Sequence, residues 1–222
     1  MNLQGCRITG IDIKSAYSRQ SGSVTPLLGA SAFSGSWPPT GWTSLQNASV
    51  DDANVTVPFN FSDWILNSQR YSSAFVGSNL YITFGSGATV FSGLSSSNPA
   101  LNKLMIGSAD YSYQRVAYKT FSDATIIRFE GYNTAGGVFP GNSNIIYECL
   151  FVSPFRYSTK RSVICLMMGN AANTGSTLFG IANTSTFYAS GTLAQNVSYV
   201  FEATNDSGTA WTLNTGSYIP LF

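Results

Sequence analysis

The 222-residue chain contains no histidine. Histidine is the commonest general base, the usual partner of a nucleophilic serine or cysteine, and the commonest zinc ligand. Its absence removes most hydrolase and metalloenzyme mechanisms, so any acid–base chemistry would rest on carboxylates. From position 51 onward the acidic residues are Asp51, Asp52, Asp63, Asp110, Asp123, Glu130, Glu148, Glu202 and Asp206.

Glu130 and Glu148 form the pair of acids best placed for a glycosidase, in which two carboxyl groups flank the scissile bond. They lie on adjacent predicted strands, where both side chains could share one sheet face. Arg128 stands two residues before Glu130, and residues two apart in a strand face the same side. Because arginine on that face can pair with carboxylates across strands, we expect a structural ion pair and no enzymatic activity.

Calcium is the metal that the acidic turns would suit best. Asp51 and Asp52 precede a predicted strand and Asp63 follows it, so their oxygens could offer ligands to this hard cation. However, the chain has no Asp-x-Asp-x-Asp-Gly loop, and acidic turns are usually solvated. We therefore expect no bound metal and no cofactor.

The three cysteines, Cys6, Cys149 and Cys165, cannot all pair within one chain. None has the Cys-x-x-Cys spacing typical of zinc or redox sites. We expect free thiols that are mostly buried.

Aromatic and amide side chains offer the other chemistry, that of recognition. Tyr111 with Tyr113, and Phe155 with Tyr157, combine ring faces with hydrogen-bonding neighbours, as in sites that bind sugars or proteins. Alternatively, tyrosines simply pack on sheet faces. Residues 134–144 predict a long hairpin loop, and loops at sandwich ends often carry recognition. The candidate binding residues are Tyr111, Tyr113, Phe139, Asn142, Asn144, Phe155 and Tyr157.

Short apolar or alternating segments recur from residue 54 onward, each bounded by Gly, Asn, Ser or Pro. This pattern predicts an all-β fold, an antiparallel β-sandwich of jelly-roll-like type, without long helices. Segments 145–152 and 162–168 are apolar on both faces, as expected of central strands covered on two sides. The predicted strands are 54–61, 73–84 with a break at Gly77, 103–107, 114–119, 124–132, 144–153, 161–168, 177–182, 197–204 and 209–213.

We expect residues 1–45 to form a short N-terminal arm and connector, and residues 46–222 to form the sandwich. Segment 6–14 predicts a strand that either pairs with a neighbouring protein or begins the same domain. The Pro-Pro pair after Trp37 favours an extended connector. Trp37 and Trp42 either form exposed carbohydrate platforms or pack the connector onto the domain.

Charge and hydropathy limit the partners. Only 9% of residues are charged, and 11 basic residues against 10 acidic residues give a net charge of +1, so no basic field attracts nucleic acid or anionic membranes. The N-terminus does not resemble a signal peptide, and no apolar run is long enough to span a bilayer. We expect synthesis in a cytoplasm and no membrane insertion.

Two motifs, Val57-Pro-Phe-Asn-Phe-Ser-Asp-Trp64 and Ser78-Asn-Leu-Tyr-Ile-Thr-Phe-Gly85, resemble the opening of nidogen-like extracellular β domains. The usual nidogen-like motif, Ser-Asn-Gly-Tyr-Ile-Thr-Phe, carries glycine where this chain has Leu80. Residues 50–213 as a whole resemble a β domain of virion proteins from tailed bacteriophages, particularly marine and cyanobacterial ones. The segments that carry this resemblance are 51–61, 78–85, 103–115, 127–131 and 179–183.

The resemblance supplies no catalytic residue and implies a structural protein of the virion. It implies a tail fibre or receptor-binding component that contacts a host surface glycan or protein through sandwich loops. By analogy with such fibres, a homotrimer attached to other virion proteins is expected. A capsid decoration or cement protein is the alternative, and a polysaccharide-degrading tail spike using Glu130 and Glu148 is a second alternative.

Overall fold

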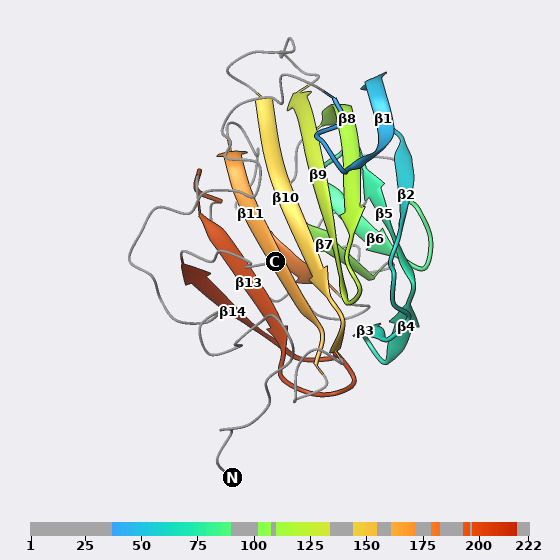
Figure 1. Cartoon of the computed structure of the whole chain (residues 1–222). Helices are drawn as coiled ribbons and strands as arrows, with labels where there is room; N and C mark the ends of the chain where they lie inside the picture. The colour runs from blue at the N-terminus through green and yellow to red at the C-terminus, as the bar shows by residue number, and fades with distance from the viewer. Residues whose placement is uncertain are drawn as a thin grey trace.

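The computed structural model describes residues 37–89, 102–107, 110–133, 144–154, 161–171, 179–182, 193–195 and 197–216. In these ranges the chain forms an antiparallel β-sandwich, as the sequence predicts (Figure 1). No helix in the described ranges is long and apolar enough to cross a membrane.

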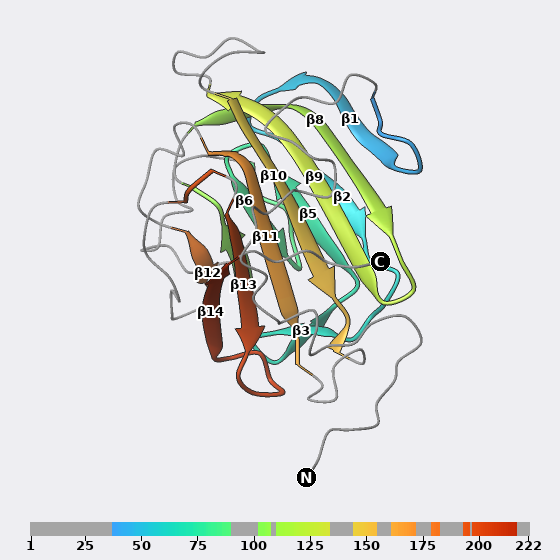
Figure 2. The ribbon, with the colours of Figure 1, turned by 60° about the vertical axis from the view of Figure 1, so that its left-hand side comes forward.

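The larger layer is a seven-stranded sheet with the order β1-β8-β9-β10-β11-β13-β14. Every neighbouring pair is antiparallel. The strands β8 to β11 are the longest of the fold and run side by side through its middle (Figures 1 and 2). The bounds are β1 (Thr43–Val50), β8 (Tyr111–Thr120), β9 (Ala124–Asn133), β10 (Asn144–Val152), β11 (Val163–Ala171), β13 (Ser198–Ala203) and β14 (Trp211–Gly216).

The smaller layer is a five-stranded sheet with the order β12-β7-β6-β5-β2. The hairpin β3-β4 forms a separate two-stranded sheet. All of these pairs are antiparallel as well. The bounds are β2 (Asn54–Pro58), β3 (Trp64–Leu66), β4 (Gln69–Tyr71), β5 (Ser73–Gly77), β6 (Tyr81–Phe84), β7 (Asn102–Met105) and β12 (Gly180–Ala182).

Each predicted segment contains one observed strand, except that 73–84 contains two, β5 and β6, and three further strands were not predicted. β1 begins at Thr43, inside the predicted connector, and crosses the expected domain boundary at residues 45 and 46. Its side chains are exposed or half-buried because it is an edge strand, so no apolar alternation marks it. β3 and β4 have only three residues each, too few to show a period.

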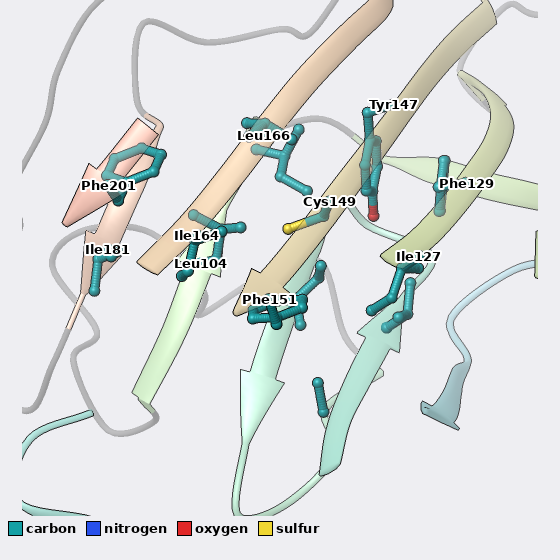
Figure 3. Close-up of a cluster of buried hydrophobic side chains, with 14 of the residues drawn as sticks. Leu104, Ile127, Phe129, Tyr147, Cys149, Phe151, Ile164, Leu166, Ile181 and Phe201 are labelled. Atoms are coloured by element: carbon teal, nitrogen blue, oxygen red, sulfur yellow. The ribbon is translucent and has the colours of Figure 1, made fainter. Parts of the chain in front are cut away.

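The core lies between the two sheets. Alternate residues of the central strands point inward, so Phe129, Tyr147 and Phe151 face the smaller sheet and are fully buried. Phe129 and Tyr147 stack with ring centroids 4.8 Å apart. Figure 3 shows this inner cluster, to which both sheets contribute Leu104, Ile127, Phe129, Tyr147, Cys149, Phe151, Ile164, Leu166, Ile181 and Phe201.

Aromatic side chains fill the core around the β3-β4 hairpin. Trp64 is fully buried, stacks on Phe84 at 4.6 Å and meets Trp211 at 6.1 Å between ring centroids. The backbone amide of Asn67 donates to the carbonyl of Gly208, which ties the hairpin to the β13-β14 turn. Aromatic burial of this extent makes this region a structural part of the domain.

Leu80 has a left-handed backbone, with φ of 59°, in the turn between β5 and β6. Its side chain is fully buried in the inner cluster, and its carbonyl accepts a hydrogen bond from the Ile106 amide at 2.8 Å. Left-handed φ is costly for leucine and free for glycine. This is the position at which the nidogen-like motif carries glycine.

Candidate functional site

Tyr111 and Tyr113, two of the predicted binding residues, lie in the core with 0% and 1% of their surface exposed. Because both are buried, the prediction that they bind a partner at the surface is wrong. Their Tyr-Ser-Tyr spacing does place both rings on one face of β8, and that face is the inner one, where Tyr113 meets Phe129 edge to face at 6.1 Å. Burial raises the pKa of both phenols.

The other predicted binding residues are placed only in part. Asn144 is the first residue of β10 and its backbone pairs with Tyr132 of β9. Phe139, Asn142, Phe155 and Tyr157 lie outside the described residues.

Strand register brings several connections to one end of the sandwich. Tyr111 pairs with Asn133, so the start of β8 and the end of β9 lie together, beside the start of β10. Val50 pairs with Tyr113, which brings the β1-β2 turn to the same end. We call this the loop end; its described parts are residues 51–53, 78–80, Asp110, Asn133 and Asn144.

Three carboxylates meet at the loop end. Asp51, Asp52 and Asp110 each present an oxygen atom, and these oxygens all lie within 4.8 Å of one another. Asp51 and Asp52 are exposed, whereas Asp110 is half-buried. The cluster makes this end a concentrated negative surface that could accept hydrogen bonds from hydroxyl or amine groups.

Asn79 holds the acidic cluster to the fold and is itself only 2% exposed. Its Nδ2 donates to Asp52 Oδ1 at 2.8 Å and to the carbonyl of Thr89 at 3.2 Å. Its Oδ1 accepts the backbone amide of Tyr111 at 2.9 Å. One buried amide therefore fixes three connections of the loop end relative to one another.

Asp63, the third acid considered for calcium, lies away from this cluster. It is 6% exposed, and both of its oxygens accept from the hydroxyl of Ser153, at 2.7 and 2.9 Å. Its role is to join the start of β3 to the end of β10 at the opposite end of the sandwich. Asp63 therefore does not share a site with Asp51 and Asp52.

Glu130 and Glu148 do share one sheet face, a placement that the sequence allows, and both are bound by Arg128. Arg128 Nε donates to Glu130 Oε1 at 2.7 Å, and Nη1 donates to Glu148 Oε1 at 2.9 Å. All three side chains are 0–1% exposed. A buried charge needs a partner of opposite sign, and the predicted structural ion pair is confirmed here as a three-residue network.

Arg115 extends this network towards the connector. Its Nη1 lies 3.6 Å from Glu130 Oε2, and its guanidinium carbon lies 5.4 Å from the ring centroid of Trp37. Two arginines thus balance two glutamates. Trp37 Nε1 also donates to Ser44 Oγ at 2.9 Å, so Trp37 is packed on the domain, one of the two roles that its sequence context allows.

The sequence analysis did not predict that Asp110 lies beside Asp51 and Asp52. Asp110 is about 60 positions away from these two residues, and only the pairing of β1 with β8 brings them together. Comparison of the chain with family models, with curated proteins and with solved structures finds no match.

Proposed function

We propose that this chain is a structural component of a bacteriophage virion, a tail fibre or receptor-binding protein that contacts the host surface through the loop end. The resemblance of the motifs given above to those of virion proteins supports the location on a particle. The described fold supports a binding role, because a rigid two-sheet scaffold presents exposed polar groups at one end. By analogy with such fibres, the protein acts as a homotrimer attached to other virion proteins.

The observation that carries the binding role is the anchored acidic surface at the loop end. Asp52 is exposed, yet Asn79 fixes its position relative to β8. The backbone amide of Asp52 in turn donates to Asp51 Oδ1 at 2.9 Å. Preorganised polar groups bind with less loss of conformational entropy than mobile ones. Carboxylates of this kind suit the hydroxyl groups of a surface glycan or the basic groups of a surface protein.

The burial of Glu130 and Glu148 argues against the polysaccharide-degrading alternative. A glycosidase needs both carboxyl groups beside the glycosidic bond, one of them able to transfer a proton. Here both are 0–1% exposed and share the guanidinium of Arg128. Their geometry therefore supports structural stabilisation.

Antibody labelling of intact particles tests where the protein lies. Gold label at the tail, seen by electron microscopy, is the expected result. Label spread over the head would replace this proposal with capsid decoration. Particles without label would overturn the virion assignment altogether.

Competition with adsorption tests the loop end. Free protein should block adsorption of the phage to its host, and Asp51→Arg should weaken the block about tenfold by reversing a central charge of the surface. Asp206→Arg is the matched control, since Asp206 is also exposed but lies in the β13-β14 turn at the opposite end. Equal effects of the two substitutions would contradict the loop end as the contact surface.

A further inference from the structure

The central strands of the seven-stranded sheet are buried on both faces, although only the inner face meets the five-stranded sheet. A second hydrophobic cluster lies on the outer face, and its members are 0–6% exposed. They alternate along the strands with residues of the inner cluster, as Leu150 does with Cys149 and Phe151. The outer cluster consists of Ala124, Ile126, Leu150, Val152, Val163, Cys165, Met167 and Val200.

The outer cluster and the buried charges form one continuous surface. Leu150 pairs with Ile126 on one side and with Cys165 on the other. Two residues further along β10, Glu148 pairs with Arg128. The surface therefore extends across four strands, from β9 to β13, which is about 15 Å at the usual strand spacing.

Such burial needs a third layer. Among the described residues, the partly buried hydrophobic side chains packed against this cluster are Trp42 and Phe121. These two partly buried side chains are too few to exclude water from eight apolar residues. The remaining cover must come from a part of the chain outside the described ranges or from a partner.

The position of the connector indicates which part of the chain supplies the remaining cover. Trp42 packs against the outer cluster, and Trp37 lies over Arg115, which belongs to the same face. Residues 37–42 therefore already run along this face. The 36 residues that precede Trp37 continue directly from it, and in extended form they could reach about 120 Å.

The sequence of that segment also suits a cover. Ile11 and Ile13 stand two apart, so in an extended strand they project to one side, with Asp12 between them projecting to the other. We propose that residues 1–36 of the same chain lie across the outer face of the seven-stranded sheet and complete the domain as a third layer. This assignment favours the interpretation of segment 6–14 as part of the same domain, and it does not depend on the proposed function.

The rates at which the two buried cysteines react with a thiol reagent report whether this cover is in place. Cys165 belongs to the outer cluster and Cys149 to the inner one. The background for the test is the whole chain carrying Cys6→Ser. In this background, the double substitution Ile11→Asp and Ile13→Asp should loosen the third layer. A thiol reagent should then label Cys165 at least about tenfold faster, because local opening governs access to a buried thiol. Labelling of Cys149, read at each site by mass spectrometry, should change little.

The matched control is Ser21→Asp with Ser23→Asp in the same background, which adds the same charge to the Ser/Gly-rich segment and should leave Cys165 protected. Unchanged labelling of Cys165 in the isoleucine variant would overturn the proposal. Equal acceleration at both cysteines would indicate global opening, and the milder pair Ile11→Ala and Ile13→Ala then decides. If Cys165 does not lead Cys149 there either, the proposal fails.

Two other occupants would give different results. If residues 217–222 are the cover, Ile219→Asp with Leu221→Asp should expose Cys165 and the Ile11 and Ile13 substitutions should not. If a second copy supplies the cover, protection of Cys165 in the Cys6→Ser protein should fall on dilution. Either outcome would overturn the assignment to residues 1–36 of the same chain.

Discussion

Cys149 and Cys165 lie on adjacent strands and face opposite sides of the seven-stranded sheet. Cys149 pairs with Leu166, and Cys165 pairs with Leu150, so the two thiols are one position out of step across β10 and β11. Neighbouring positions along a strand point to opposite faces, which separates the sulfur atoms by the sheet itself. Both thiols are free and buried, as the sequence analysis predicts for them.

The first prediction concerns these thiols in the intact protein. In the Cys6→Ser variant, a thiol reagent should label Cys149 and Cys165 at least about a hundredfold more slowly in buffer than in concentrated urea. Burial blocks access and raises the pKa of both thiols, so little reactive thiolate forms. The absorbance of the released reagent measures the rate. Fast labelling of either cysteine in buffer would contradict the placement of that residue.

The second prediction concerns the buried ion network. Arg128→Met should lower the free energy of unfolding by about 3 to 5 kcal/mol, because it leaves Glu130 and Glu148 buried without their guanidinium partner. Urea denaturation measures the change. Arg70→Met, at an exposed site on β4, is the control and should have little effect.

Replacing the whole network tests the same relationship. Arg128→Met combined with Glu130→Leu and Glu148→Leu should recover most of the stability lost in Arg128→Met, since apolar groups then replace all three charges. A triple variant less stable than the single one would show that the carboxylates are not the source of the loss.

Much of the fold could be predicted because the central strands are buried on both faces. Apart from Glu148 and Ser162, segments 145–152 and 162–168 are apolar on both faces, and the structure confirms β10 and β11 as central strands. The shared face of Arg128 and Glu130 followed from their spacing alone. The strands that escaped prediction are β1, an edge strand with polar side chains, and the three-residue strands β3 and β4.

The candidate site was harder to predict than the fold. The spacing of Tyr111 and Tyr113 shows that they share a face, but only the packing of β8 shows that this face is the inner one. Along β8, the register shift between Tyr113 and Arg115 then reverses the alternation and turns Arg115 to the outer face. The acidic cluster depends on strand pairing between distant segments, which no local pattern reveals.

The third prediction is a pH dependence caused by Lys103. Its side chain is fully buried on β7, and burial lowers its pKa from 10.5 to about 8. Between these values the unfolded chain holds the proton and the folded chain does not, so this group makes stability rise with pH from about 8 to about 10.5. Below pH 8 both states are protonated, and its contribution is constant.

Lys103→Met removes this dependence. The free energy of unfolding of the variant minus that of the parent should therefore fall as pH rises through the same window. The unfolding equilibrium constant of the variant, divided by that of the parent, should rise by at most about tenfold per pH unit. Urea denaturation at a series of pH values measures the difference. Met105→Leu, on the same strand, introduces no titrating group, and its difference from the parent should not vary with pH.

The fourth prediction uses the left-handed backbone of Leu80. Leu80→Ala should cost about 2 to 5 kcal/mol, because it empties part of the inner cluster while the strained φ of 59° remains. Leu80→Gly also loses the side chain, but it relieves about 1 to 2 kcal/mol of backbone strain. The glycine variant should therefore be at least as stable as the alanine variant.

Leu104 provides the comparison for that prediction. It is also fully buried in the inner cluster, but it lies within β7. In a strand, glycine costs about 0.5 to 1 kcal/mol more than alanine, so Leu104→Gly should be less stable than Leu104→Ala. Urea denaturation of the four variants gives both differences. If glycine falls below alanine at position 80 by the same margin as at position 104, strain at Leu80 does not contribute. If the order inverts only at position 80, the turn favours glycine conformationally, and Leu80 is retained there for its buried side chain.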